Sequence, residues 1–189
     1  MTRLDDKQIR SSLIQRLKSQ PVKPKAVIEE LRVHNGNAIA DVVALYKDAH
    51  CFEIKGDGDK IERILKQGHY YNLSFRKITL VTTIKHLKKA LSISPDFWGI
   101  IIAERNDERV TLKHIRHAKN NSNFNKSLAL MILWKSEMLN LLYTQNSRNK
   151  NKSRELLAQL IAKSIKKEEL SNEICSLLLN RYHQARSFV

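Results

Sequence analysis

Residues 38–55 read AIADVVALYKDAHCFEIK, and this stretch decides the expected fold. Two runs rich in branched and apolar residues flank the polar turn Lys47–Ala49, a pattern typical of neighbouring strands. Asp41 lies in the first run, and Glu53 and Lys55 lie two positions apart in the second. Because strand residues two apart point to the same face, an acid and a lysine share one face beside a second acid.

A tight hairpin is expected immediately before this stretch. Residues 26–34 (AVIEELRVH) predict a strand, and residues 37–46 predict the next one. Between them lies Asn35-Gly36, a dipeptide that strongly indicates a two-residue hairpin turn. The first two strands should therefore pair in antiparallel fashion.

The turn also predicts which acids face each other. If it has two residues, His34 pairs with Asn37, and counting back places Glu30 opposite Asp41. Two directly opposed acids repel each other, and a divalent cation would offset that repulsion. A one-residue bulge in the hairpin would place Glu29 there instead.

The other expected elements complete an α/β fold. Apolar periodicity, turn residues and β-branched runs predict a helix over 4–19, a helix from the Gly56–Asp59 turn to about Ser74, a strand over 77–83, a short helix over 86–91, a strand over 97–103 and an edge strand over 110–115. The α-β-β-β-α-β order implies a mixed central sheet flanked by helices. The strands on either side of the 60–73 helix should be parallel.

The composition changes after this core. Residues 117–125 are polar and Asn-rich, and the chain beyond them predicts helices over 127–143, 153–163 and 168–184. We therefore expect a core over 1–120 and an all-helical C-terminal module over 121–189. The 127–143 helix is too apolar to stand alone, so it should pack on the core, on its neighbours or on a partner, including a second copy in a homodimer.

Charge points to the class of partner. The formal net charge is +15, which favours a polyanion, with nucleic acid first and an anionic membrane second. No stretch approaches the roughly 20 apolar residues of a membrane span, and the N-terminus resembles no secretory signal. Cys51 and Cys175 lie in different expected elements, which argues for a reducing cytoplasm.

The helical tail carries basic residues suited to phosphate contacts. Lys150, Lys152 and Arg154 lie in or next to the basic loop 146–152, and they could follow a DNA backbone. The alternative is a solvated basic cap, and the sequence favours the two interpretations about equally.

Oxygen donors on the two central strands suggest a metal site. Mg²⁺ prefers a near-octahedral shell of oxygen ligands, and Asp41, Glu53 and the carbonyl of Ile54 could supply three of them. Lys55 could hydrogen-bond an attacking water or the developing negative charge. Taken alone, this pattern is more typical of a salt bridge on a strand surface. Gln67, four residues before Tyr71 and so on the same helix face, could orient the water or a phosphate.

These residues resemble the PD-(D/E)xK nuclease superfamily, including RecB-type nuclease domains. The resemblance rests on Asp41, Glu53-x-Lys55 and Gln67-x-x-x-Tyr71, and Ala40 replaces the proline that often precedes the aspartate. A further likeness is to a largely uncharacterised bacterial and phage family classed as restriction-endonuclease-like. It covers the segments 28–45, 52–71, 77–83, 95–104 and 131–142, and it departs at Ile39, where relatives often carry arginine.

The resemblance implies roles for individual residues. Asp41 and Glu53 would be metal ligands, Lys55 the catalytic lysine and Gln67 an auxiliary site residue. An additional acidic ligand would be Glu30 on the hairpin count, with Asp6 and Glu29 as rivals.

The implied function is that of a metal-dependent deoxyribonuclease in the cytoplasm, using Mg²⁺ or Mn²⁺ to hydrolyse DNA phosphodiesters through a metal-activated water. The alternative is an inactive protein of the same fold that binds nucleic acid or regulates. Tyr71 and the basic residues Lys150, Lys152 and Arg154 would contact the nucleic acid.

Overall fold

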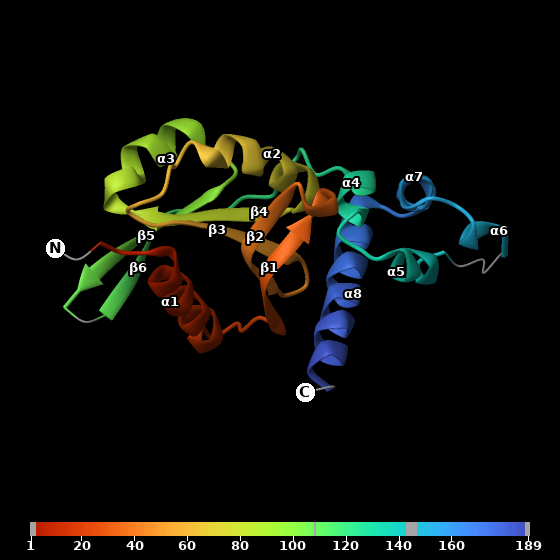
Figure 1. The fold of residues 1–189 in the computed structure, drawn as a ribbon, viewed down its shortest axis with the longest axis horizontal. Helices are drawn as coiled ribbons and strands as arrows, with labels where there is room; N and C mark the ends of the chain where they lie inside the picture. Colours follow the sequence, from red (N-terminus) through yellow and green to blue (C-terminus); the bar gives the residue numbers. More distant parts are fainter. Residues whose placement is uncertain (1–2, 108, 143–146, 188–189) are drawn as a thin grey trace.

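A six-stranded mixed sheet forms the centre of the fold, in a computed structural model that describes residues 3–107, 109–142 and 147–187 (Figure 1). The strands lie side by side in chain order: β1 (Ala26–Val33), β2 (Ala38–Leu45), β3 (Ala49–Lys55), β4 (Lys77–Thr83), β5 (Gly99–Asn106) and β6 (Arg109–Arg116). β3, β4 and β5 are parallel, and the other neighbours are antiparallel. The predicted mixed sheet, its parallel pair and its edge strand are confirmed.

Helices cover both faces of this sheet (Figure 1). They are α1 (Asp6–Ser19), α2 (Arg63–Ser74), α3 (Leu87–Ile93), α4 (Lys126–Leu130), α5 (Lys135–Asn140), α6 (Ser147–Lys150), α7 (Arg154–Ser164) and α8 (Lys167–Ser187), with short 3-10 turns at His34–Gly36 and Ile84–His86. The helix expected from about residue 60 begins only at Arg63, because Asp59 accepts a hydrogen bond from the Gly56 amide at 2.7 Å and holds residues 56–59 in a turn.

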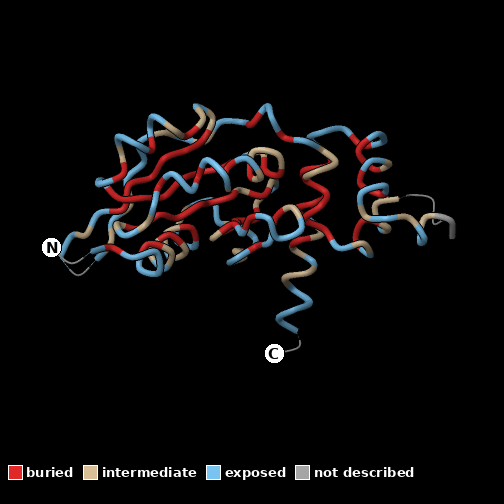
Figure 2. The backbone as a smooth tube through the Cα atoms, turned by 45° about the horizontal axis from the view of Figure 1, so that its top comes forward, coloured by how far each residue is buried: buried red, intermediate tan, exposed pale blue. Residues whose placement is uncertain are grey.

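The two faces have separate cores. On one face, α1 buries Ile9, Leu13 and Leu17, which are spaced to share one side of the helix, against residues such as Val42 and Phe52. On the other face, α2 packs in a larger core that continues into α4, α7 and α8. Each fully buried aliphatic side chain contributes about 1.5–3 kcal/mol. Figure 2 shows this burial along the strands.

The core also crosses the expected boundary at residue 120. Leu130, Leu157 and Leu170 from the C-terminal helices belong to the same buried cluster as Tyr71 and Leu80 from the sheet region. The C-terminal helices are therefore packed on the sheet. The last turns of α8 extend away from the body and are exposed (Figures 1 and 2).

The hairpin has the expected register. Glu29 pairs with Val42 and Leu31 with Ala40, so Glu30 lies opposite Asp41, and the bulged alternative is wrong. Three consecutive residues with positive φ form the turn: His34 at 50°, Asn35 at 59° and Gly36 at 89°. The sequence signal at 35–36 therefore fixed the alignment of the two strands correctly.

Gly36→Ala should destabilise the fold by about 1 kcal/mol, because a side chain at this positive φ is strained. The position is otherwise open, since a Cβ there would meet nothing within 4 Å. Gly58→Ala is the matched control, because its Cβ would also meet nothing and its φ is not positive. Urea unfolding of both variants checks this, and equal midpoints would contradict it.

The expected 127–143 helix is wrong as a single element. It is divided into α4 and α5 by residues 131–134, and Tyr143 lies outside the described residues. The reason is burial: Leu130, Met131, Ile132 and Leu133 are all buried in succession, and four consecutive residues cannot share one face of a helix. The break turns all of them into the core.

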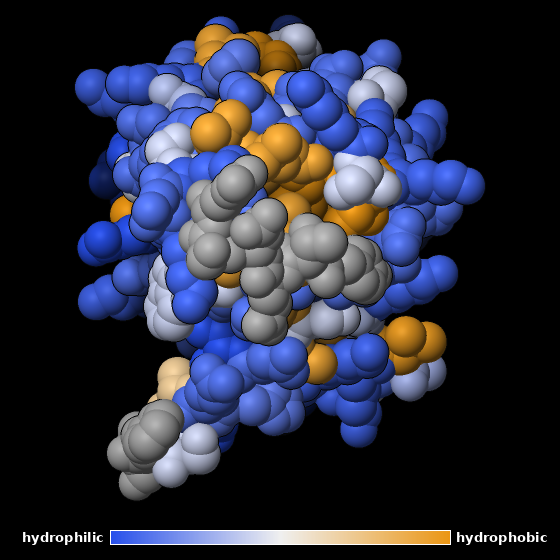
Figure 3. All heavy atoms as spheres, turned by 90° about the vertical axis from the view of Figure 1, so that its right-hand side faces the viewer, coloured by the Kyte–Doolittle hydropathy of each residue, from blue (hydrophilic) through white to orange (hydrophobic). Residues whose placement is uncertain are grey.

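This burial also limits the homodimer expected through the same segment. Its apolar residues pack on α7 and α8 within one chain, which leaves Trp134 exposed at 57%. The face in Figure 3, which views the end of the molecule carrying α5 and α7, is mostly hydrophilic with an apolar patch between the charged side chains. Dimerisation stays a prediction.

Candidate active site where strands β2 and β3 separate

Strands β2 and β3 stop pairing close to the predicted acids. Val42 and Phe52 form the last pair of their ladder. Beyond it, the Asp41 carboxylate accepts a hydrogen bond from the Ile54 amide at 2.7 Å. A side chain thus satisfies a backbone donor that would otherwise pair with β2, and this holds Asp41 beside the end of β3.

Glu53 and Lys55 lie next to Asp41 on the face covered by α2. Glu53 is fully buried, and Lys55 is 5% exposed. The Lys55 ammonium forms an ion pair with Glu53 and donates to the Ile54 carbonyl at 3.2 Å. The structure therefore brings together the three predicted residues Asp41, Glu53 and Lys55. They lie around the Ile54 carbonyl, which was also predicted as a ligand.

Tyr71 adds information about the protonation of Glu53. Its hydroxyl lies 2.7 Å from both Glu53 Oε2 and the Ile39 carbonyl oxygen. A phenol has one proton to donate, and both oxygens accept from it. This donation favours the ionised form of Glu53, as the ion pair with Lys55 also does.

Burial has the opposite effect and favours the protonated state. It raises the pKa of Glu53 to about 7, with the charge on Asp41 adding to the effect and Lys55 and Tyr71 opposing it. Burial also raises the pKa of Asp41, against the lowering effects of the Ile54 amide, Lys55 and Arg10. A cation placed between two acids that repel each other in this way would stabilise their charged forms.

Gln67 lies one turn before Tyr71 on the same side of α2. Its Oε1 atom is buried and, within the part of the chain that the structure describes, has no hydrogen-bond partner. An unpaired buried acceptor is costly. Together with Asp41, Glu53 and the Ile54 carbonyl, it makes a set of oxygen donors of the kind that Mg²⁺ prefers.

Arg10 is a site residue that sequence reasoning missed. It extends from α1, whose first turn is capped by Asp5, and its guanidinium lies 3.3 Å from Asp41 and 3.0 Å from Glu30. Asp6 also lies 3.9 Å from it. The i,i+4 spacing of Asp6 and Arg10 was a visible signal for one ion pair, but nothing local pointed to the strand acids.

Arg10 lies against each of the acids predicted as the additional metal ligand. Glu30, with a side chain 68% exposed, and Glu29, at 3.9 Å, both lie against Arg10. Across residues 3–107, 109–142 and 147–187, no group of three or more His, Cys, Asp and Glu side chains could hold a metal ion. Glu30 is ion-paired with Arg10 in this structure, and the role of Glu30, Glu29 or Asp6 as the additional ligand stays a prediction.

Comparison with known proteins gives the family. The family model of bacteriophage P4 protein cII matches residues 1–189. The chain belongs to the bacteriophage P4 cII family. It is similar to protein cII of Enterobacteria phage P4, with 25% identity over 181 residues that cover 95% of this chain and 69% of that protein. No solved structure matches. These matches do not mention PD-(D/E)xK nucleases, so that resemblance stays a prediction.

Two of the predicted DNA contacts have structural roles in this member of the cII family. Tyr71 is fully buried and bonded to Glu53, so its ring offers no surface to a base. Arg154 donates to the carbonyls of Met131 and Leu133, so its charge is used inside the chain. The Tyr71 assignment is therefore corrected, whereas the contact of Arg154 with DNA stays a prediction.

The other two basic residues that were predicted to contact DNA lie at the surface of this cII family member. Lys150, at the end of α6, is exposed, and Lys152 is partly exposed. Asn146, the first residue of the predicted basic loop, lies outside the described residues.

Among the described helices, none is long and apolar enough to cross a membrane.

Proposed function

We propose that this chain is a metal-dependent nuclease that hydrolyses phosphodiester bonds of DNA. One observation carries the proposal: Asp41, Glu53 and Lys55 meet at the point where β2 and β3 separate, with buried Glu53 and partly buried Asp41 each held by a specific hydrogen bond. Perturbed buried acids next to a lysine are characteristic of functional sites. The order of elements supports a restriction-endonuclease-like core.

The donors present fit Mg²⁺ or Mn²⁺. Asp41, Glu53 and the Ile54 carbonyl would hold the cation, and the buried, unsatisfied Oε1 atom of Gln67 comes from the same helix as Tyr71, which contacts Glu53. When bound, the cation supplies an activated water and neutralises charge on the phosphate. Hard oxygen ligands of this kind are suited to those cations.

The protein groups around these donors hold them in place. The Ile54 amide fixes one oxygen of Asp41, and Arg10 contacts the other. Tyr71 fixes Glu53. Lys55 can exchange its contact with Glu53 for a hydrogen bond to the attacking water or to a phosphate oxygen, which would stabilise the negative charge that develops there.

The net charge supports DNA as the substrate. A formal charge of +15 attracts a polyanion, and the exposed Lys150 is one cation able to contact a phosphate backbone. The buried free thiols of Cys51 and Cys175 suit a protein that works in the cytoplasm.

A cleavage panel tests the proposal. Supercoiled plasmid, linear duplex, single-stranded DNA and RNA are incubated with Mg²⁺, Mn²⁺ or EDTA. We expect cutting of a DNA substrate with metal and none with EDTA. Lys55→Met should lower the rate by about 10²-fold or more, because it removes a donor for the developing charge.

Lys88→Met is the matched control for this panel. Lys88 is an exposed lysine on α3, so its loss should leave the rate unchanged. Equal cleavage by wild type and Lys55→Met, or cleavage that persists in EDTA, would overturn the assignment.

A second candidate is a protein of this fold that binds nucleic acid without cutting it. The Lys55 ammonium contacts both Glu53 and the Ile54 carbonyl, and so already compensates the oxygens that a metal would use. Such a protein would bind DNA equally with and without Mg²⁺. Gel-shift titration with Mg²⁺ or EDTA, alongside the cleavage panel, separates the two candidates.

A further inference from the structure

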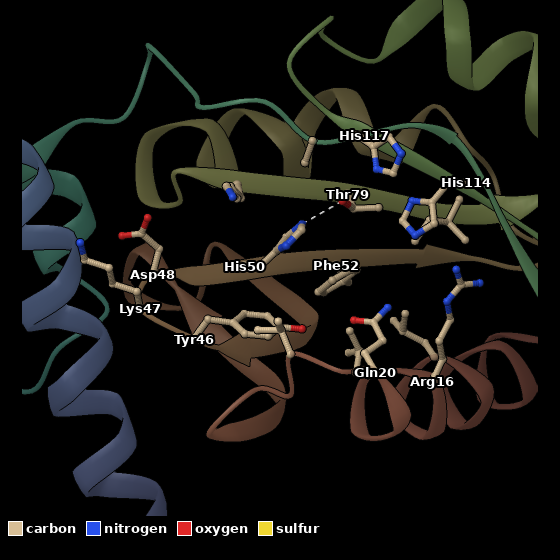
Figure 4. Close-up of a pocket in the computed structure, with 16 residues that line it drawn as sticks. Arg16, Gln20, Tyr46, Lys47, Asp48, His50, Phe52, Thr79, His114 and His117 are labelled. Carbon is tan, nitrogen blue, oxygen red and sulfur yellow. Dashed lines mark hydrogen bonds between the residues drawn. The ribbon is translucent and has the colours of Figure 1, made fainter.

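A second concave site lies on the other face of the sheet. It is a cavity of about 580 Å³ between the second half of α1, the β2–β3 turn and the first residues of β3 and β4 (Figure 4). His50 and Phe52 line it, whereas Glu53 and Lys55 at the end of β3 do not. This cavity is therefore separate from the candidate active site.

The interior of this cavity is apolar and flat. Leu13 and Leu17 of α1 face Phe52 and Ile101 of the sheet. The ring of His50 stacks on Phe52 with centroids 4.2 Å apart and planes 22° apart. The stacked pair forms the floor of the cavity, with Phe52 buried, and exposed Val22 and partly exposed Tyr46 supply its accessible apolar surface. The volume is typical of sites for small organic molecules.

The polar groups at the cavity are mostly cationic or neutral. Arg16, Lys47 and Lys77 line it. Asp48 is the one carboxylate among the described lining residues, and it is paired with Arg76 at 3.6 Å. The lining therefore has a positive balance, which favours an anion.

Burial and the cationic neighbours in this lining lower the pKa values of two histidines, His50 and His114. The pKa of His50 is lowered to about 3, first by burial and then by Lys77 and His114. Burial, Arg16 and His117 lower the pKa of His114, whose ring stacks on His117 at 4.8 Å. Figure 4 shows His114 and His117 on the side of the cavity facing His50, with Arg16 of α1 and Gln20, just after the end of α1, below.

We infer that this cavity binds a small organic anion with a planar apolar body, of the class of aromatic carboxylates and sulfonates. The ring system would lie against Tyr46 and Val22, above the buried Phe52, and the anionic group would face Lys77 and Arg16. Exposed residues such as Val22 and Lys77 lie at its rim, so such a molecule can enter from solvent, and its apolar floor distinguishes it from a surface that tracks a nucleic-acid backbone.

The test uses the fluorescent probe 1-anilinonaphthalene-8-sulfonate, an aromatic sulfonate, in titrations of the folded protein. We expect saturable binding to one site. The neutral analogue N-phenyl-1-naphthylamine has the same rings without the sulfonate, and it should bind about tenfold more weakly, because the ion–ion attraction of about 1.4 kcal/mol is lost.

Two variants place the probe in the cavity. Gln20→Trp fills it from a partly exposed position just after the end of α1 and should remove the binding, with circular dichroism confirming that the fold is kept. Lys77→Gln should weaken sulfonate binding several-fold, whereas Lys88→Gln, at an exposed position on α3, should not.

Three outcomes would overturn the inference. Unchanged binding by folded Gln20→Trp would place the probe elsewhere. Equal affinity for the neutral analogue would show that the cavity does not select anions. Displacement of the probe by a short DNA duplex that also protects His114 and His117 from diethyl pyrocarbonate would assign the cavity to nucleic acid.

Discussion

Asp41→Asn is expected to lower metal-dependent DNA cleavage by about 10³-fold, because several kcal/mol of charge stabilisation disappear with the carboxylate. The substitution is close to isosteric. The amide oxygen of asparagine can still accept the hydrogen bond from the Ile54 amide, which is 2.7 Å long in the wild type. Strand geometry should therefore survive while the ligand charge is lost.

The stability of the same variant separates charge from structure. Loss of the Asp41 charge relieves its repulsion of buried Glu53, so the free energy of unfolding should stay equal or rise. Asp41→Ala leaves the Ile54 amide without its acceptor and should cost about 1–3 kcal/mol. Asp96→Asn is the control, because that carboxylate is fully exposed.

Cleavage rates and urea unfolding of these three variants check the prediction. If Asp41→Asn cuts DNA at the wild-type rate, Asp41 is not a metal ligand. If it loses both activity and stability, the carboxylate has a structural role that its amide cannot replace.

The sequence was most informative where local rules determine the structure. The Asn35-Gly36 turn fixed the register that places Glu30 opposite Asp41, and the strand period placed Glu53 and Lys55 on one face. Both follow from residues within a few positions of one another. The mixed sheet followed from the β-branched runs and the helix between β3 and β4.

The sequence was least informative where distant residues meet. Arg10 lies 31 positions before Asp41, and no pattern in α1 showed that it would reach two strands. The segment after residue 126 was misjudged because its apolar content is equally consistent with one helix or two. Four consecutive buried residues require the break, and burial depends on packing partners that the local sequence does not reveal.

Arg154→Met is expected to destabilise the protein by about 3 kcal/mol, because charge-assisted hydrogen bonds to buried carbonyls are lost and those acceptors stay unpaired. Arg154 Nη2 donates to the carbonyls of Met131 and Leu133 at 2.8 and 2.7 Å, and Nη1 donates to the Asn35 side chain at 2.8 Å. One guanidinium thus joins the break between α4 and α5 to the β1–β2 hairpin.

The contrast with neighbouring cations makes this prediction decisive. The sequence groups Arg154 with Lys150 and Lys152 as a phosphate contact. If that were its only role, Arg154→Met would weaken the affinity for DNA without changing the stability of the fold. Arg63→Met is the control, because Arg63 is exposed at the start of α2. Urea unfolding should separate the two variants by about 3 kcal/mol; equal midpoints combined with weaker DNA binding would return Arg154 to the nucleic-acid surface. A large loss of stability would mean that the helical tail is fixed to the sheet by this arginine, which in turn sets the position of the hairpin carrying Asp41.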